Sequence, residues 1–75
     1  MPLVQIKVVE GALSDDEKNR LIGNVTEAVL SIYGENFRPH TWVLIEDVRS
    51  GQWGAGGNSV TTEDIKGLRA APTTR

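Results

Sequence analysis

The sequence PLVQIKVVEG spans residues 2–11 and determines how the rest of the chain is interpreted. Its apolar side chains recur at every second position, at Val4, Ile6 and Val8. Alternation of this kind, in a segment rich in β-branched residues, is typical of a strand that buries at least one face. We therefore expect a strand over residues 3–9, which ends at the Glu-Gly pair that follows it.

Residues 14–34 carry the signals of one long helix. Ser14 is followed three residues later by Glu17, the spacing of a capping box in which each side chain bonds the other residue's backbone N–H. The acidic first turn suits the positive end of the helix dipole, and Gly34 is a natural stop. The apolar residues then recur at helical spacing and predict one buried stripe, made of Leu21, Ile22, Val25, Ala28, Val29 and Ile32.

A second strand is expected over residues 41–48 (TWVLIEDV). Pro39 disfavours helix at Arg38 and is expected to begin an extended run. One helix between two strands makes a β-α-β unit, whose strands are parallel and joined by a right-handed crossover. Two strands alone leave their edges open and make a weak sheet. The fold class is therefore expected to be α/β, with a sheet that neighbouring copies extend.

The glycine-rich segment GQWGAGG at residues 51–57 predicts turns and a short C-terminal hairpin. It lacks the Lys-Ser/Thr ending of a phosphate-binding loop and precedes no long helix, which excludes nucleotide binding. A short helix is expected over residues 61–68, capped by Thr61 or Thr62. Residues 69–75 are expected to form a flexible tail of a single domain that spans residues 1–75.

The length of 75 residues limits the chain to one domain with a marginal core. Small domains usually add disulfides, a metal or association. The absence of cysteine and the single histidine, His40, argue against disulfides and zinc, so we expect association, no metal and no cofactor. The net charge of -2 without a basic stripe excludes a nucleic-acid partner. No apolar run is long enough for a membrane span, and no signal peptide is apparent, so a cytoplasmic protein is expected.

Proline as the second residue has two interpretations. A strand can begin with proline because no ladder N–H is needed there. Alternatively, removal of Met1, which a small second residue permits, exposes the secondary amine of Pro2. An α-amino group ordinarily titrates at about 7.7–8.0, and a desolvated pocket beside cations lowers that pKa. A neutral amine near physiological pH is a competent general base.

Several segments together resemble the 4-oxalocrotonate tautomerase family, in order and in spacing, over about residues 2–57. They are the opening PLVQIKVVEG, the Ser-Asp-x-x-Lys helix start, the second strand and the turn Trp53-Gly54-Ala55-Gly56-Gly57. The resemblance implies a tautomerase that moves a proton in an enol or unsaturated 2-oxo acid. It also implies an active site at a subunit junction in a homohexamer, a trimer of dimers. A mixed assembly with a related subunit is an open alternative.

The resemblance assigns the catalytic base to Pro2 and the aromatic residue of the pocket to Trp53. Two family arginines, which hold a substrate carboxylate and polarise its carbonyl, have no match. One falls near Ala12 and Leu13, and the other falls on Trp42. With Trp53, Trp42 is expected to wall an aromatic cavity suited to an apolar or aromatic monocarboxylate, with indole N–H donors for a substrate oxygen. The alternative for Trp42 is ordinary interface packing.

Three further residues are candidates for substrate binding. Arg38 and Arg49 flank the second strand and are either carboxylate-binding residues or solvated surface charges. His40 either donates a hydrogen bond to a carbonyl or caps the strand edge. Glu46 shares the strand face of Trp42 and is a candidate to activate water. The alternative functions are therefore a hydratase, dehalogenase or decarboxylase of the same superfamily, or a non-catalytic oligomer that binds a small ligand.

Overall fold

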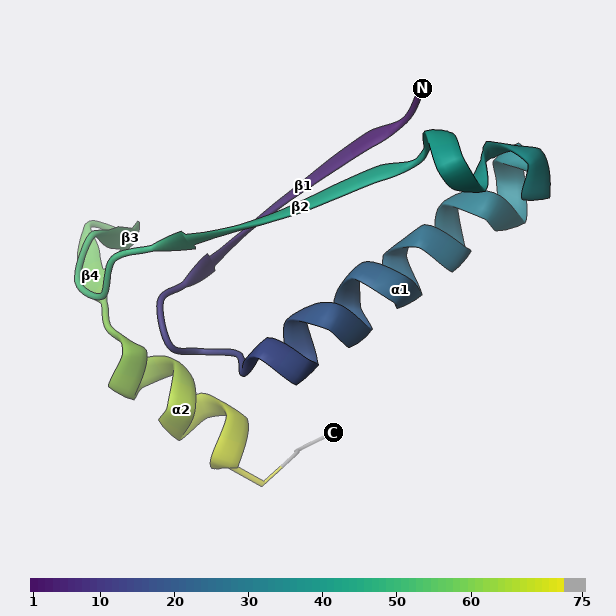
Figure 1. Ribbon diagram of the computed structural model, residues 1–75. Helices are drawn as coiled ribbons and strands as arrows, with labels where there is room; N and C mark the ends of the chain where they lie inside the picture. Colours follow the sequence, from purple (N-terminus) through teal and green to yellow (C-terminus); the bar gives the residue numbers. More distant parts are fainter. Residues whose placement is uncertain (73–75) are drawn as a thin grey trace.

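The computed structural model describes residues 1–72 and has a β-α-β unit followed by a hairpin and a second helix (Figure 1). The elements are β1 (Leu3–Val9), α1 (Asp15–Tyr33), the 3-10 helix η1 (Glu35–His40), β2 (Trp42–Val48), β3 (Trp53–Ala55), β4 (Asn58–Val60) and α2 (Thr62–Ala70). β1 and β2 pair in parallel, and β3 and β4 are antiparallel. The predicted α/β class, with a crossover helix and a C-terminal hairpin, is confirmed.

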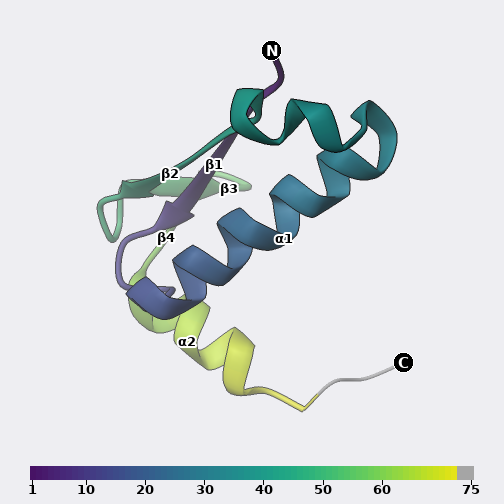
Figure 2. The same ribbon diagram turned by 45° about the vertical axis from the view of Figure 1, so that its right-hand side comes forward.

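One face of the β1–β2 pair is covered by α1, and the other is open (Figure 2). The register places Leu3 opposite Trp42 and Lys7 opposite Glu46. Because side chains alternate between the faces of a strand, the residues on the covered face are half-buried, at Val4, Ile6, Val43 and Ile45. The open face instead carries exposed apolar side chains, at Leu3, Trp42 and Leu44.

The hydrophobic core is small. The buried apolar residues among residues 1–72 are Val9, Ala12 and Leu30. The predicted helix stripe is wrong at its carboxyl end, because Ile32 is 87% exposed while Leu30, outside the stripe, is buried. The spacing predicted the helix correctly. Which side of the helix is buried depends on how α1 lies across the sheet. A core of this size fits a subunit that is stabilised by association.

The ends of α1 form as the sequence predicts. The Ser14 hydroxyl accepts a hydrogen bond from the Glu17 backbone N–H at 3.1 Å, and the Ser14 N–H donates to Glu17 Oε1 at 3.0 Å. Gly34 ends the helix with a φ of 99°, a conformation that favours glycine, and its N–H donates to the Leu30 carbonyl at 2.9 Å. No helix within residues 1–72 is long and apolar enough to cross a membrane.

The expectation that an extended run begins at Pro39 is wrong. Arg38 and Pro39 belong to η1, and the strand begins only at Trp42. The fixed φ of proline is compatible with a 3-10 helix. The turn is also held by side chains, because the Arg38 guanidinium donates to Glu35 at 2.6 Å and to Glu27 at 2.7 Å. These exposed ion pairs, one within η1 and one with α1, support the 3-10 turn.

The C-terminal part contains a tight hairpin and an ordered helix. Gly56 and Gly57 connect β3 to β4 with positive φ values of 59° and 82°, as a type I′ turn requires. Thr61 caps α2, as predicted, in a capping box with Asp64. The helix continues to Ala70, so the expectation that residues 69 and 70 belong to a tail is wrong. Residues 73–75 of the expected tail lie outside the described part of the chain.

Candidate active site

Pro2 lies at the amino end of β1, beside the start of β2. Its carbonyl oxygen accepts a hydrogen bond from the Trp42 backbone N–H at 3.0 Å, which fixes the residue against the sheet. Met1 is 73% exposed and therefore open to removal. While Met1 is attached, the Pro2 nitrogen is an amide without a basic lone pair. Removal of Met1 would convert it into a secondary amine at the end of an ordered strand.

Three of the other candidates lie at the same end of the strands as Pro2. Trp42 is 57% exposed on the open face of the sheet. His40 lies at the end of η1, with its ring edge-on to that of Phe37 at a centroid distance of 6.4 Å. Arg38 makes four hydrogen bonds to the carboxylates of Glu35 and Glu27. These bonds stabilise the charged guanidinium and raise the pKa of Arg38, so this cation is already paired within its own chain.

Arg49 and Trp53 lie at the opposite end of the strands, beyond the carboxyl end of β2 (Figure 1). A cavity of about 300 Å³ opens there. Its lining is mainly apolar and consists of Lys7, Val8, Val9, Ala12, Leu13, Trp53, Ile65 and Arg69. A seven-residue strand at about 3.3 Å per residue separates this cavity from Pro2 by roughly 20 Å. Within one chain, a small substrate does not reach both.

Arg69 connects α2 to the turn between β1 and α1. Its Nη1 donates to the Ala12 carbonyl at 2.8 Å and to Glu17 Oε1 at 3.2 Å, and its Nη2 donates to Glu17 Oε2 at 2.5 Å. The Arg69 hydrogen bond, followed by that from the Ser14 backbone, lowers the pKa of Glu17 to about 2. Arg69 was not predicted as a site residue, because residues 69–75 were expected to form a tail. Helical continuation of the apolar spacing from Ile65 was the available signal.

The amino end of α2 is held against the same turn. The Thr62 hydroxyl donates to the Glu10 carbonyl, and the Thr62 backbone N–H donates to Ser50 Oγ at 2.9 Å. Gly11 has a φ of 78°, and a Cβ added there would lie 3.0 Å from Thr62 Cγ2. Glycine is therefore required at this position both by its backbone conformation and by the close approach of α2.

We expect the Glu17–Arg69 pair to make folding stability depend on acidic pH. The folded pKa of Glu17, about 2, lies below its ordinary value of 4.5. The stability that Glu17 contributes is therefore present above that ordinary value and is lost as the pH falls toward 2. Urea unfolding of the wild type at about pH 6 and about pH 3 should show a larger loss of unfolding free energy than in Glu17→Gln.

Asp16→Asn provides the matched control, because Asp16 has only an exposed pairing with Arg20 at 3.9 Å. This variant should lose as much stability between the two pH values as the wild type does. If Glu17→Gln also loses as much as the wild type, the pair does not carry the pH dependence.

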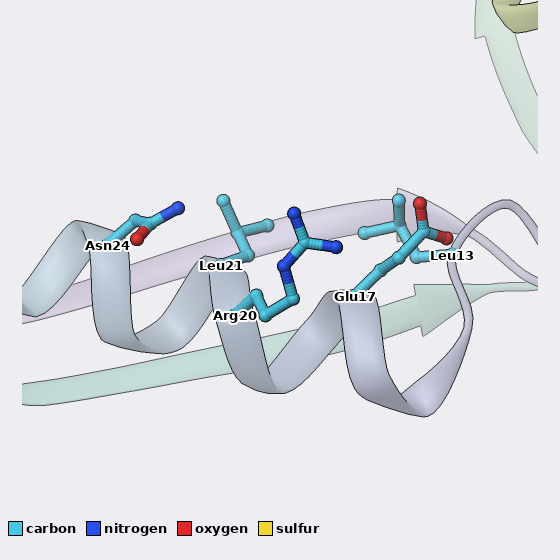
Figure 3. A pocket seen from close by; sticks show the side chains of 5 residues that line it. All are labelled: Leu13, Glu17, Arg20, Leu21 and Asn24. Atoms are coloured by element: carbon cyan, nitrogen blue, oxygen red, sulfur yellow. The ribbon is translucent and has the colours of Figure 1, made fainter.

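A second hollow, of about 210 Å³, lies along the surface of α1 (Figure 3). Its lining comes from successive turns of the helix and from the loop before its N-cap, at Leu13, Glu17, Arg20, Leu21 and Asn24. The Glu17 carboxylate is already bound by Arg69, and Arg20 is highly exposed. This hollow contains none of the residues that the sequence predicted for the site, so the candidate site is at the ends of the strands.

Comparison with known proteins identifies the family of this chain. A family model described as tautomerase enzyme matches residues 2–63. A probable tautomerase of Dickeya dadantii (strain 3937) is 36% identical over 61 residues, which cover 81% of this chain and 90% of the relative. The crystal structure of DmpI from Helicobacter pylori has a TM-score of 0.69 and 31% identity, over 79% of this chain and 95% of that chain. TomN, a 4-oxalocrotonate tautomerase homologue of the tomaymycin biosynthetic pathway, has a TM-score of 0.70 and 26% identity, over 96% and 100%. The chain therefore belongs to the tautomerase family, as its resemblance to 4-oxalocrotonate tautomerases predicts.

Proposed function

We propose that this protein is a tautomerase that moves a proton in an enol or unsaturated 2-oxo acid, with the Pro2 nitrogen as general base. The observation that carries the proposal is the position of Pro2, at the ordered end of β1 beside the exposed Trp42, where the family match begins. An apolar surrounding disfavours the charged ammonium and lowers the pKa of such an amine. The neutral amine accepts the proton from the substrate and returns it to another atom.

The proposed substrate site is shared between two copies of the chain. Pro2 and the cavity beside Trp53 lie at opposite ends of the same strands. Within the part of the chain that the structure describes, β1 and β2 pair only with each other, so each keeps an open edge. Antiparallel pairing of two copies across such an edge brings the amino end of one strand beside the carboxyl end of the other. Pro2 of one copy then faces the cavity of its partner.

A larger assembly explains the open face of the sheet. Leu3, Trp42 and Leu44 are exposed there, although they are large and apolar. Contiguous exposed apolar surface marks an interaction site in soluble proteins. A homohexamer built as a trimer of dimers buries this face, and a mixed assembly with a related subunit uses the same surface. The protomer is therefore proposed to function only as part of an oligomer.

The proposed substrate is an apolar or aromatic 2-oxo acid with one carboxylate. Trp42 stands where the family has an arginine, so the Pro2 end of the site lacks that cation. Arg38 does not replace it, because its hydrogen bonds go to Glu27 and Glu35. A second substrate carboxylate would then be desolvated without a partner, which is unfavourable.

The test is enol ketonisation, followed by ultraviolet absorbance, with protein whose mass shows that Met1 is absent. We expect higher kcat/KM for phenylenolpyruvate than for 2-hydroxymuconate. Trp42→Ala should lower kcat/KM for the aromatic substrate by roughly tenfold, the size of one aromatic contact, and change that for the dicarboxylate little. Preference for 2-hydroxymuconate would contradict the substrate proposal. If neither is turned over, release of halide or CO2, or addition of water, would indicate one of the alternative reactions.

A further inference from the structure

We propose that Arg69 binds the substrate carboxylate in the cavity at the carboxyl end of the strands. It would replace, from α2, the arginine that the turn between β1 and α1 lacks. The inference rests on the proposed function, because its ligand is the substrate of the shared site. The family match ends at residue 63, before Arg69, so this assignment concerns a part of the chain that the match does not include.

The Arg69 guanidinium lies beside the turn that lacks the family arginine. The missing family arginine falls near Ala12 and Leu13, and both residues line the cavity together with Arg69. Arg69 Nη1 lies 2.8 Å from the Ala12 carbonyl oxygen. Arg69 is far from this turn in the sequence, but its guanidinium lies beside the position where the family arginine is missing. The contacts of Thr62 with Glu10 and Ser50 hold the other end of α2 and fix this position.

Arg69 has N–H donors that its bonds to Ala12 and Glu17 do not use. A guanidinium has five N–H donors, and the three recorded bonds to Ala12 and Glu17 occupy both hydrogens of Nη1 and one of Nη2. Within residues 1–72, no acceptor bonds the Nε–H or the second Nη2 hydrogen. These two hydrogens lie on one edge of the planar group, in the arrangement that binds a carboxylate through two parallel hydrogen bonds. Glu17 accepts hydrogen bonds on the neighbouring edge and leaves these two hydrogens free.

The charge and the apolar lining of the cavity suit an aromatic carboxylate. Glu17 balances the charge of Arg69, but Lys7 adds a second cation to the cavity wall. None of the lining residues is acidic. The remaining wall is apolar and includes Trp53 and Ile65. The cavity is therefore complementary to an aromatic ring that carries a single carboxylate. The ring would contact Trp53 and Ile65, and the carboxylate would contact Arg69.

The direct test is binding of 3-phenylpropanoate, a saturated carboxylate that does not tautomerise, to the processed oligomer. Titration followed by NMR should shift the Arg69 Nε–H signal. Arg69→Gln should weaken binding by about 10- to 100-fold, the range for hydrogen bonds to a charged group. Arg20→Gln, which alters an exposed arginine on α1, should bind like the wild type. Unchanged binding in Arg69→Gln would overturn the proposal.

A second variant separates carboxylate binding from a purely structural role of the Glu17–Arg69 pair. Glu17→Gln breaks the same ion pair but keeps the guanidinium. It should retain most of the binding of 3-phenylpropanoate. If Glu17→Gln loses as much binding as Arg69→Gln does, Arg69 acts only by holding α2, and the proposal is wrong.

Kinetics provide the matching functional result. Arg69→Gln should raise KM for phenylenolpyruvate by about 10- to 100-fold, with a small change in kcat and in turnover of the methyl ester. An unchanged KM would overturn the proposal. The binding assay does not need the base, so Pro2→Ala should still bind 3-phenylpropanoate. Loss of that binding in Arg69→Gln, in a protein without ketonisation activity, would support Arg69 while contradicting the proposed function.

Discussion

Protein that retains Met1 is expected to lose about 10²- to 10⁴-fold in ketonisation rate relative to the processed protein, the usual contribution of a general base. The reason is chemical, since an acylated Pro2 nitrogen has no basic lone pair. The measurement is kcat/KM for phenylenolpyruvate on two samples that mass spectrometry distinguishes by one methionine. Both samples should have the same assembly mass, which separates loss of the base from loss of the oligomer.

Pro2→Ala is the companion variant. After removal of Met1 it presents a primary amine at the same place, so it should retain more activity than the blocked protein and less than the wild type. The pH dependence of kcat/KM should report the titration of the terminal amine in the wild type. Equal rates for blocked and processed protein would show that the terminal nitrogen is not the base.

Leu44→Glu is expected to dissociate the assembly and to abolish turnover, although it leaves Pro2 untouched. Leu44 is 44% exposed in the middle of the open sheet face, on the same side as Trp42. In an assembly that buries this face, the new carboxylate would be desolvated without a partner, at a cost of several kilocalories per mole. Analytical ultracentrifugation should show a smaller species, and the enol assay should show no proline-dependent rate.

Ile32→Glu is the matched control for this prediction. Ile32 is 87% exposed on the last turn of α1, away from the open face. The same change of apolar side chain to carboxylate should therefore leave the assembly mass and the activity close to those of the wild type. Wild-type mass and activity in Leu44→Glu would show that the open face is not the assembly surface, and would remove the basis for a shared site.

The main elements were predictable because local signals in the sequence specify them. Alternation predicts β1, and the capping box at Ser14 predicts the start of α1. The signals that failed depend on contacts between elements. Arg38 lies in η1, where it pairs with Glu27 of α1, and Leu30 is buried because of the way α1 lies across the sheet.

The candidate site was predictable at Pro2, Trp42 and Trp53, but not at Arg69. Pro2 and Trp42 were identified by the resemblance, and the β1–β2 register brings them together. Arg69 was not identified, because its contact with Glu17 joins residues that are 52 positions apart. No spacing rule in a single sequence predicts where a short C-terminal helix docks.

The docking of α2 on the turn after β1 has a consequence for the origin of selectivity. The helix begins with its own capping box at Thr61 and contacts the turn through a few polar groups. The selectivity proposed for Arg69 therefore depends on the contacts of α2 with this one turn. The proposed base, Pro2, and the proposed anion receptor, Arg69, lie far apart in the sequence. If both proposals hold, substitutions in α2 are expected to change which acids are accepted without changing the base.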